Sequence, residues 1–198
     1  MRGKVGLVVV ALGLGLAGPV WADDVGAQID AARTTYGKGD ALHTLSALQA
    51  AVDLLQGHLS DQFAKTMPPP PAGWEAGAAS SVALDSIGGG LTVSRAYTKG
   101  DSTLNASLVI DNPSVEATVT MFRNSTQLTA QPGWSRVKVG ADDAILRFDA
   151  SSRAGEISIL VGERALLQIE GTDINKDDVL LDAAKGWNVA ALRKLLGP

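Results

Sequence analysis

The chain has 198 residues, no cysteine and a formal net charge of −4. Without cysteine the protein cannot be a disulfide-stapled scaffold, so its fold must depend on a hydrophobic core, and a 45% share of hydrophobic residues is sufficient for one. The acidic balance argues against nucleic acid as a partner, because phosphate groups are repelled by a negatively charged surface.

The N-terminus has the three parts of a cleavable secretory signal. Two basic residues, Arg2 and Lys4, precede an apolar run over 5–16, and Ala22 is the small residue expected at a cleavage site. The run is shorter than the about 20 apolar residues of a membrane span. We therefore expect residues 1–22 to be a signal peptide cleaved after Ala22. The protein should be soluble in the periplasm, without stable insertion in a membrane or a lipid anchor.

Residues 23–66 predict a helical hairpin. Apolar residues recur every three or four positions over 25–36 and again over 41–65, which indicates two amphipathic helices. Between them Gly39 permits a left-handed turn, and Asp40 can cap the second helix. One face of the second helix carries large apolar residues: Leu45, Leu48, Val52, Leu55, Leu59 and Phe63. This face needs a partner.

The turn Tyr36-x-x-Gly39-Asp40 resembles a single tetratricopeptide unit, in which an aromatic residue closes the first helix and a glycine-aspartate turn opens the second. Stacked units of this kind bind peptides, but a solenoid needs about three repeats. We therefore expect one hairpin that packs on the following domain. The candidate partner-binding residues are Tyr36, Leu48, Leu55 and, beyond the hairpin, Trp74.

Residues 67–87 predict a proline-rich linker. The four prolines over 68–71 impose an extended conformation that neither a helix nor a central strand can continue. Such a run can be a ligand for aromatic grooves. Between two ordered segments we expect a stiff connector instead, with Trp74 packed on the next domain.

Residues 88–198 predict an antiparallel sheet with covering helices. After Gly88-Gly89-Gly90 the hydrophobic period changes to two, which is typical of strands. Asn112-Pro113 predicts a capped helix start, and two more helices are expected near 176–184 and 189–196. The six expected strands span 91–97, 104–110, 134–139, 144–148, 156–161 and 165–169. This order of elements indicates the α+β class.

The order of strands and helices resembles the α/β/α sandwich of the family named for Mog1 and the photosystem II protein PsbP. The segments Tyr36-x-x-Gly39-Asp40, Pro70-Pro71-Ala72-Gly73-Trp74 and Gly88-Gly89-Gly90 together resemble a group of uncharacterised exported proteobacterial proteins. Neither resemblance implies an activity or a cofactor.

The motifs that suggest catalysis have the wrong context. Ser135-x-x-Lys138 matches a motif of penicillin-binding enzymes, but in a strand these two side chains face opposite sides of the sheet. His43 and His58 lie about four helical turns apart, too far for one metal ion. We expect no catalytic residue, no cofactor and no enzymatic activity.

The best metal candidate is Asp173-x-Asn175-x-Asp177, which begins like a calcium loop. The sixth position of such a loop should be glycine and is Asp178, and the twelfth should be glutamate and is Ala184. We expect a polar turn before a helix, with weak calcium binding as the alternative.

These patterns favour a non-catalytic envelope accessory protein or protein-binding module. One alternative is a small-ligand or calcium-binding protein with a pocket between the sheet and its helices. Another is a hydrolase, which would need His43 or His58 in a buried cleft.

Overall fold

The computed structural model describes residues 20–84, 88–124 and 132–197, with side chains from Asp24 onward. Most of the predicted signal peptide lies outside these residues, so the signal and its cleavage after Ala22 stay predictions. The chain divides into two compact units, residues 1–55 and 56–198. Within the described segments no helix is both long and apolar enough to cross a membrane.

The first unit is the predicted helical hairpin. It contains α1 (Val20–Gly37) and the part of α2 (Ala41–Ala64) that ends at Leu55. Gly39 has a φ of 78°, which is the left-handed turn that the sequence indicates. The backbone N–H of His43 donates to the Asp40 carboxylate at 3.2 Å, so Asp40 caps α2 as predicted.

The helices of the hairpin pack through small side chains. The buried residues of this contact are Val25, Ala32 and Ala51, which are 7%, 4% and 5% exposed. The hydroxyl groups of Thr35 and Thr44 lie 2.9 Å apart and link the two helices near the turn. The interior of the hairpin is therefore narrow, with little apolar area to bury.

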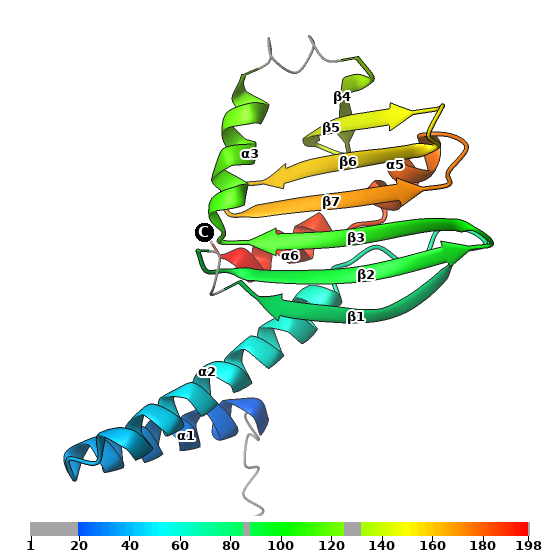
Figure 1. The fold of residues 1–198 in the computed structure, drawn as a ribbon. Coiled ribbons are helices and arrows are strands. Elements are labelled where there is room, and N and C mark those ends of the chain that lie inside the picture. Colours follow the sequence, from blue (N-terminus) through cyan, green and yellow to red (C-terminus); the bar gives the residue numbers. More distant parts are fainter. Residues whose placement is uncertain (1–19, 85–87, 125–131, 198) are drawn as a thin grey trace, which may run out of the picture. The chain divides into compact units, whose positions relative to one another are not determined.

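The second unit is built on a seven-stranded antiparallel sheet with the order β1-β2-β3-β7-β6-β5-β4 (Figure 1). Its strands are β1 (Glu75–Ala83), β2 (Leu91–Lys99), β3 (Ser102–Ile110), β4 (Trp134–Val139), β5 (Asp142–Asp149), β6 (Ala154–Val161) and β7 (Ala165–Thr172). The six predicted strands are confirmed, and β4 to β7 form the predicted meander. The α+β class is also confirmed.

Helices lie on both sides of this sheet (Figure 1). On one side α5 (Asp178–Lys185) and α6 (Val189–Leu196) bury Leu180 and Leu192 against the main core. On the other side α3 (Pro113–Arg123) buries Val115. Asn112 caps α3 as predicted, because its side chain accepts a hydrogen bond from the Ser114 N–H at 3.0 Å. The resemblance to the Mog1 and PsbP family stays a prediction.

The segment between the two predicted domains differs from the expectation. Residues 75–83 of the predicted 67–87 linker form β1, an edge strand of the sheet. Sequence reasoning missed β1 because it consists mostly of alanine, glycine and serine, and a bulge between Ala76 and Ala79 breaks its register. The boundary between the units also lies inside α2. Phe63 does not continue the face of Leu45, because it is buried in the core of the sheet unit.

The three consecutive glycines before β2 are required by the backbone. All of Gly88, Gly89 and Gly90 have positive φ values, between 88° and 100°. A Cβ on Gly90 would overlap the carbonyl oxygen of Ile110, whereas a Cβ on Gly89 would meet no atom within 4 Å. The run therefore lets the chain pass the end of β3 closely as it enters β2.

We expect Gly90→Ala to lower the free energy of unfolding of the sheet unit by at least about 3 kcal/mol, because it adds an overlap to the cost of a positive φ. Gly89→Ala carries only the cost of the positive φ, about 1–2 kcal/mol, and is the matched control. Urea denaturation followed by circular dichroism measures both. Equal losses in the two variants would contradict this role of Gly90.

Candidate functional site

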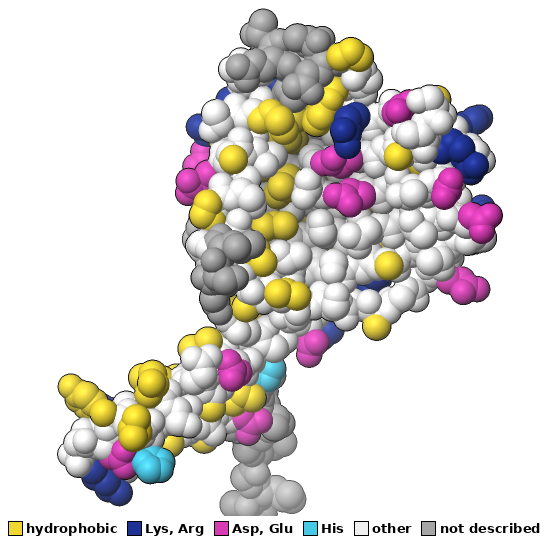
Figure 2. Space-filling view, in the orientation of Figure 1, with side chains coloured by type: hydrophobic (Ala, Val, Ile, Leu, Met, Phe, Trp, Pro, Cys, Tyr) yellow, Lys and Arg dark blue, Asp and Glu magenta, His cyan; other side chains and the backbone are white. Residues whose placement is uncertain are grey.

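The hairpin unit exposes a set of large apolar side chains. Six of them, 42% to 77% exposed, define what we call the apolar face: Ile29, Tyr36, Leu45, Leu48, Val52 and Leu55. Figure 2 shows hydrophobic side chains at the surface of the hairpin. Exposed apolar residues that lie next to one another mark interaction surfaces more often than isolated ones do.

These six residues fall on one side of the hairpin. Positions 25, 28, 32 and 35 in α1 and 44, 47, 51 and 54 in α2 are partly or fully buried, and each set is spaced to lie along one side of its helix. Each residue of the apolar face directly follows one of these positions in the sequence. It is therefore rotated by about 100° around the helix axis from the inner position before it. Because α1 and α2 are antiparallel, the same rotation brings both sets to the same side.

The opposite side of the hairpin carries small and polar residues. In α2 these are His43, Ser46, Ala50 and Asp53, and in α1 they are Ala27, Ala31 and Thr34. The hairpin therefore has one apolar side and one side of small and polar residues. This contrast makes Ser46 a natural position for control variants.

Three of the four predicted partner-binding residues, Tyr36, Leu48 and Leu55, lie on the apolar face. The sequence did not reveal that the helices contact each other through the neighbouring stripe of alanine and threonine. That stripe could have been found, because Thr44, Ala47 and Ala51 repeat with the same spacing as the leucines beside them. Ile29, Leu45 and Val52 belong to the apolar face as well but were not among the predicted partner-binding residues.

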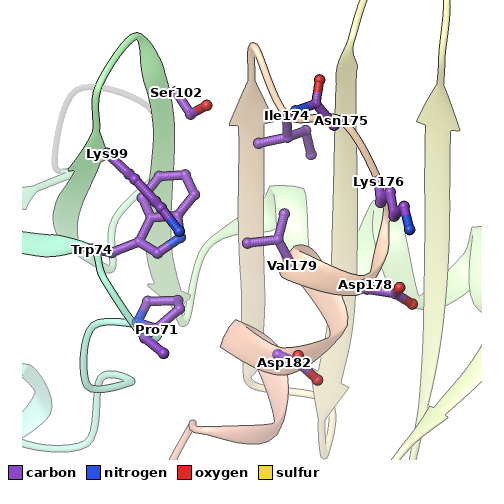
Figure 3. A pocket seen from close by; sticks show the side chains of 11 residues that line it. Pro71, Trp74, Lys99, Ser102, Ile174, Asn175, Lys176, Asp178, Val179 and Asp182 are labelled. Carbon is purple, nitrogen blue, oxygen red and sulfur yellow. The ribbon is translucent and has the colours of Figure 1, made fainter.

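The fourth candidate, Trp74, belongs to the sheet unit and lines a pocket of about 440 Å³. Figure 3 shows Trp74 and Lys99 on one side of this pocket, with Ile174 and Val179 pointing in from the other side. Asn175 and Asp182 add polar groups at its rim. An aromatic ring, aliphatic side chains and a polar rim are the usual parts of a small-ligand site.

The proline-rich segment that carries this pocket is fixed by a buried tyrosine. Tyr97, which is 1% exposed, donates its hydroxyl to the carbonyl oxygen of Pro68 at 2.6 Å. Burial raises the pKa of Tyr97 above its ordinary value. Tyr97 thus joins β2 to the start of the predicted linker and holds Trp74 near the sheet.

The calcium candidates Asp173, Asn175 and Asp177 have separate roles. The Asp173 carboxylate lies 3.9 Å from Arg153, and its backbone carbonyl accepts a hydrogen bond from the Ser102 hydroxyl at 2.7 Å. Asp177 occupies the N-cap position of α5, but its side chain makes no capping hydrogen bond. In the described part of the chain no three His, Cys, Asp or Glu side chains gather as a metal site would require. Calcium binding stays a prediction.

The residues of the rejected catalytic motifs have structural partners. Ser135 and Lys138 lie on β4, where Ser135 donates to the Leu146 carbonyl at 3.4 Å and Lys138 pairs with Asp143 at 2.7 Å. The exposed ring of His43 lies 2.7 Å from Asp40, and hydrogen bonds from the His43 backbone and ring lower the pKa of Asp40. His58 is half-buried in α2.

Comparison of the chain with protein-family models, with curated proteins and with solved structures finds no match. The candidate sites therefore rest on the geometry of this chain.

We expect Tyr97→Phe to lower the free energy of unfolding at neutral pH by about 1–2 kcal/mol, because the Pro68 carbonyl loses its donor. Since burial raises the Tyr97 pKa above 10.0, the stability from its neutral form is complete below pH 10.0 and is lost as the pH rises beyond it. Urea denaturation from neutral to alkaline pH should therefore show a shallower alkaline loss in Tyr97→Phe than in the wild type. Identical alkaline slopes would contradict the assignment.

Proposed function

We propose that the protein is exported to the periplasm after cleavage behind Ala22 and acts there as a non-catalytic accessory protein of the cell envelope. Its role in this proposal is that of a protein-binding module, and the apolar face of the hairpin is the binding surface. The signal-like N-terminus supports the location, and the apolar face supports the mode of action.

The proposal rests on a difference in side-chain size. The stripe of each hairpin helix that faces the other helix holds smaller residues than the exposed stripe beside it. The inner stripe holds small residues such as Ala32 and Ala51, whereas the large side chains of Leu45, Leu48 and Leu55 remain exposed. Full burial of one such side chain is worth about 1.5–3 kcal/mol. Six half-exposed side chains therefore offer on the order of 5 kcal/mol when a partner buries them.

A partner that buries a similar apolar area doubles this gain to on the order of 10 kcal/mol, which exceeds the lower estimates of the cost of association, about 4–15 kcal/mol. Binding through the apolar face alone is therefore expected to be reversible rather than permanent. The chemistry of the face also limits the partner. Along this side of the hairpin the side chains are aliphatic or aromatic apart from Arg33, so the partner must present an apolar surface. An amphipathic helix has the right shape to lie along a helical hairpin.

We expect the double variant Leu48→Asp/Leu55→Asp to lose bound envelope proteins by at least about tenfold, because binding would bury two unpaired carboxylates. A pull-down of tagged protein from periplasm, with quantification of the recovered proteins, measures this loss. Ser46→Asp adds one such charge to the opposite side of the hairpin and should recover partners like the wild type. Equal recovery by the double variant and the wild type would refute the proposed surface.

A second candidate function, small-ligand binding, is favoured by the pocket at Trp74. The indole and Val179 form apolar walls, and Lys99 supplies a cation beside them. This candidate concerns only the sheet unit and does not depend on the hairpin.

For this second function we expect calcium or envelope lipids to raise the melting temperature of the wild type, since a ligand that binds the native state stabilises it. Trp74→Ala should abolish a lipid-induced increase, and Asp173→Asn should abolish a calcium-induced one. No increase in the wild type with either ligand would eliminate the candidate.

A further inference from the structure

We propose that the partner of the apolar face is a second copy of this chain, with two hairpins packed face to face and tip to base as a four-helix bundle. This inference rests on the proposed function and specifies the partner of the same surface. The tip is the turn between α1 and α2, and the base is the opposite end of the hairpin.

The spacing of the exposed residues in α2 is that of a helix-to-helix seam. Leu45, Leu48, Val52 and Leu55 are separated by three, four and three residues, which is the apolar repeat of coiled coils. The same seam on a second copy offers the same ridges and grooves. A two-fold axis between Leu48 and Val52 would place Leu45 of each chain opposite Leu55 of the other. The face can therefore complement itself, as an isologous dimer interface must.

The positions beside the seam do not oppose this pairing. In the heptad pattern set by the seam, Thr44 and Ala51 flank it on the side that packs on α1, and Gln49 flanks it on the other side. These positions decide which helices pair, and like charges there would repel a second copy. All three residues are uncharged, so an identical helix meets no repulsion along the seam.

The charges of the hairpin select the relative direction of the two copies. Near the tip, Arg33 and Lys38 are basic and outnumber the single carboxylate of Asp40, which accepts hydrogen bonds from His43. Toward the base, Asp24, Asp30 and Asp53 lie away from the apolar face, so Arg33 is the charged residue on that side of the hairpin. Packing tip to base keeps Arg33 of one copy apart from Arg33 of the other. Packing tip to tip would bring like charges together.

Sedimentation equilibrium of the purified protein tests the proposal. We expect a reversible monomer-dimer equilibrium between about 1 µM and about 100 µM protein. Leu48→Asp should weaken dimerisation by at least about thirtyfold, because each copy would bury an unpaired carboxylate at the centre of the seam. Ser46→Asp, with the same charge on the opposite side, should dimerise like the wild type. Circular dichroism of both variants verifies that the helices are intact.

A separate double variant tests the direction in which the two hairpins pack. Arg33→Glu/Lys38→Glu makes the whole hairpin acidic and should weaken the dimer about threefold to tenfold at low salt, with a smaller effect at high salt. An unchanged or stronger dimer would overturn the tip-to-base arrangement.

The outcomes separate this inference from the proposed function. A wild type that stays monomeric throughout this range overturns the second-copy proposal. If a different envelope protein is then recovered through Leu48 and Leu55, the protein-binding function stands with another partner. A dimer that Leu48→Asp leaves intact also overturns the proposal, because the copies would then associate through another surface.

Discussion

The hairpin leaves most of its large apolar side chains exposed, and the proposed function depends on this constraint. Its helices approach through Ala32, Ala51 and the Thr35–Thr44 hydroxyl pair, which keep the interior narrow. Leu45, Leu48 and Leu55 of α2 occupy the adjacent stripe and are exposed. Helices gain most of their stability from packing, and the contact between these two buries little apolar area. In the proposed function a partner supplies the missing area.

The sheet unit does not share this need. Its strands bury continuous apolar residues such as Leu104, Leu108, Ile157 and Leu167 under α5 and α6, each 1% exposed or less. Two residues of this unit have specific structural roles. Gly90 lets the chain pass close to the end of β3 as it enters β2, and Tyr97 fixes the proline-rich segment. The two units thus differ in kind, because one has a complete core and the other presents an incomplete one.

The sequence predicted the elements whose residues alternate or repeat clearly. The meander from β4 to β7, the capped start of α3 at Asn112 and the turn at Gly39 follow from local chemistry. The strand β1 could not be predicted, because its alanines and serines have no periodic contrast and its pairing with β2 is a tertiary event. The boundary between the two units, which lies inside α2, could not be predicted either. Phe63 continues the helical repeat, yet it is buried in the sheet unit.

The candidate site was predictable only in part. Tyr36, Leu48 and Leu55 were recognisable as apolar residues at helical spacing, but periodicity alone does not tell an inner stripe from an outer one. The structure makes this distinction through the burial of Ala51 and the exposure of Leu48. The pocket at Trp74 needed the structure, since its walls come from segments about a hundred residues apart in the chain.

Hydrogen-deuterium exchange at several protein concentrations tests the central claim most directly. If a second copy covers the apolar face, the amides of α1 and of α2 up to Leu55 should exchange more slowly as the concentration rises, because the dimer stabilises the hairpin. Amides of β6 and β7 serve as the internal reference and should not change. Hairpin exchange that is independent of concentration, at levels where the protein should dimerise, would contradict the account.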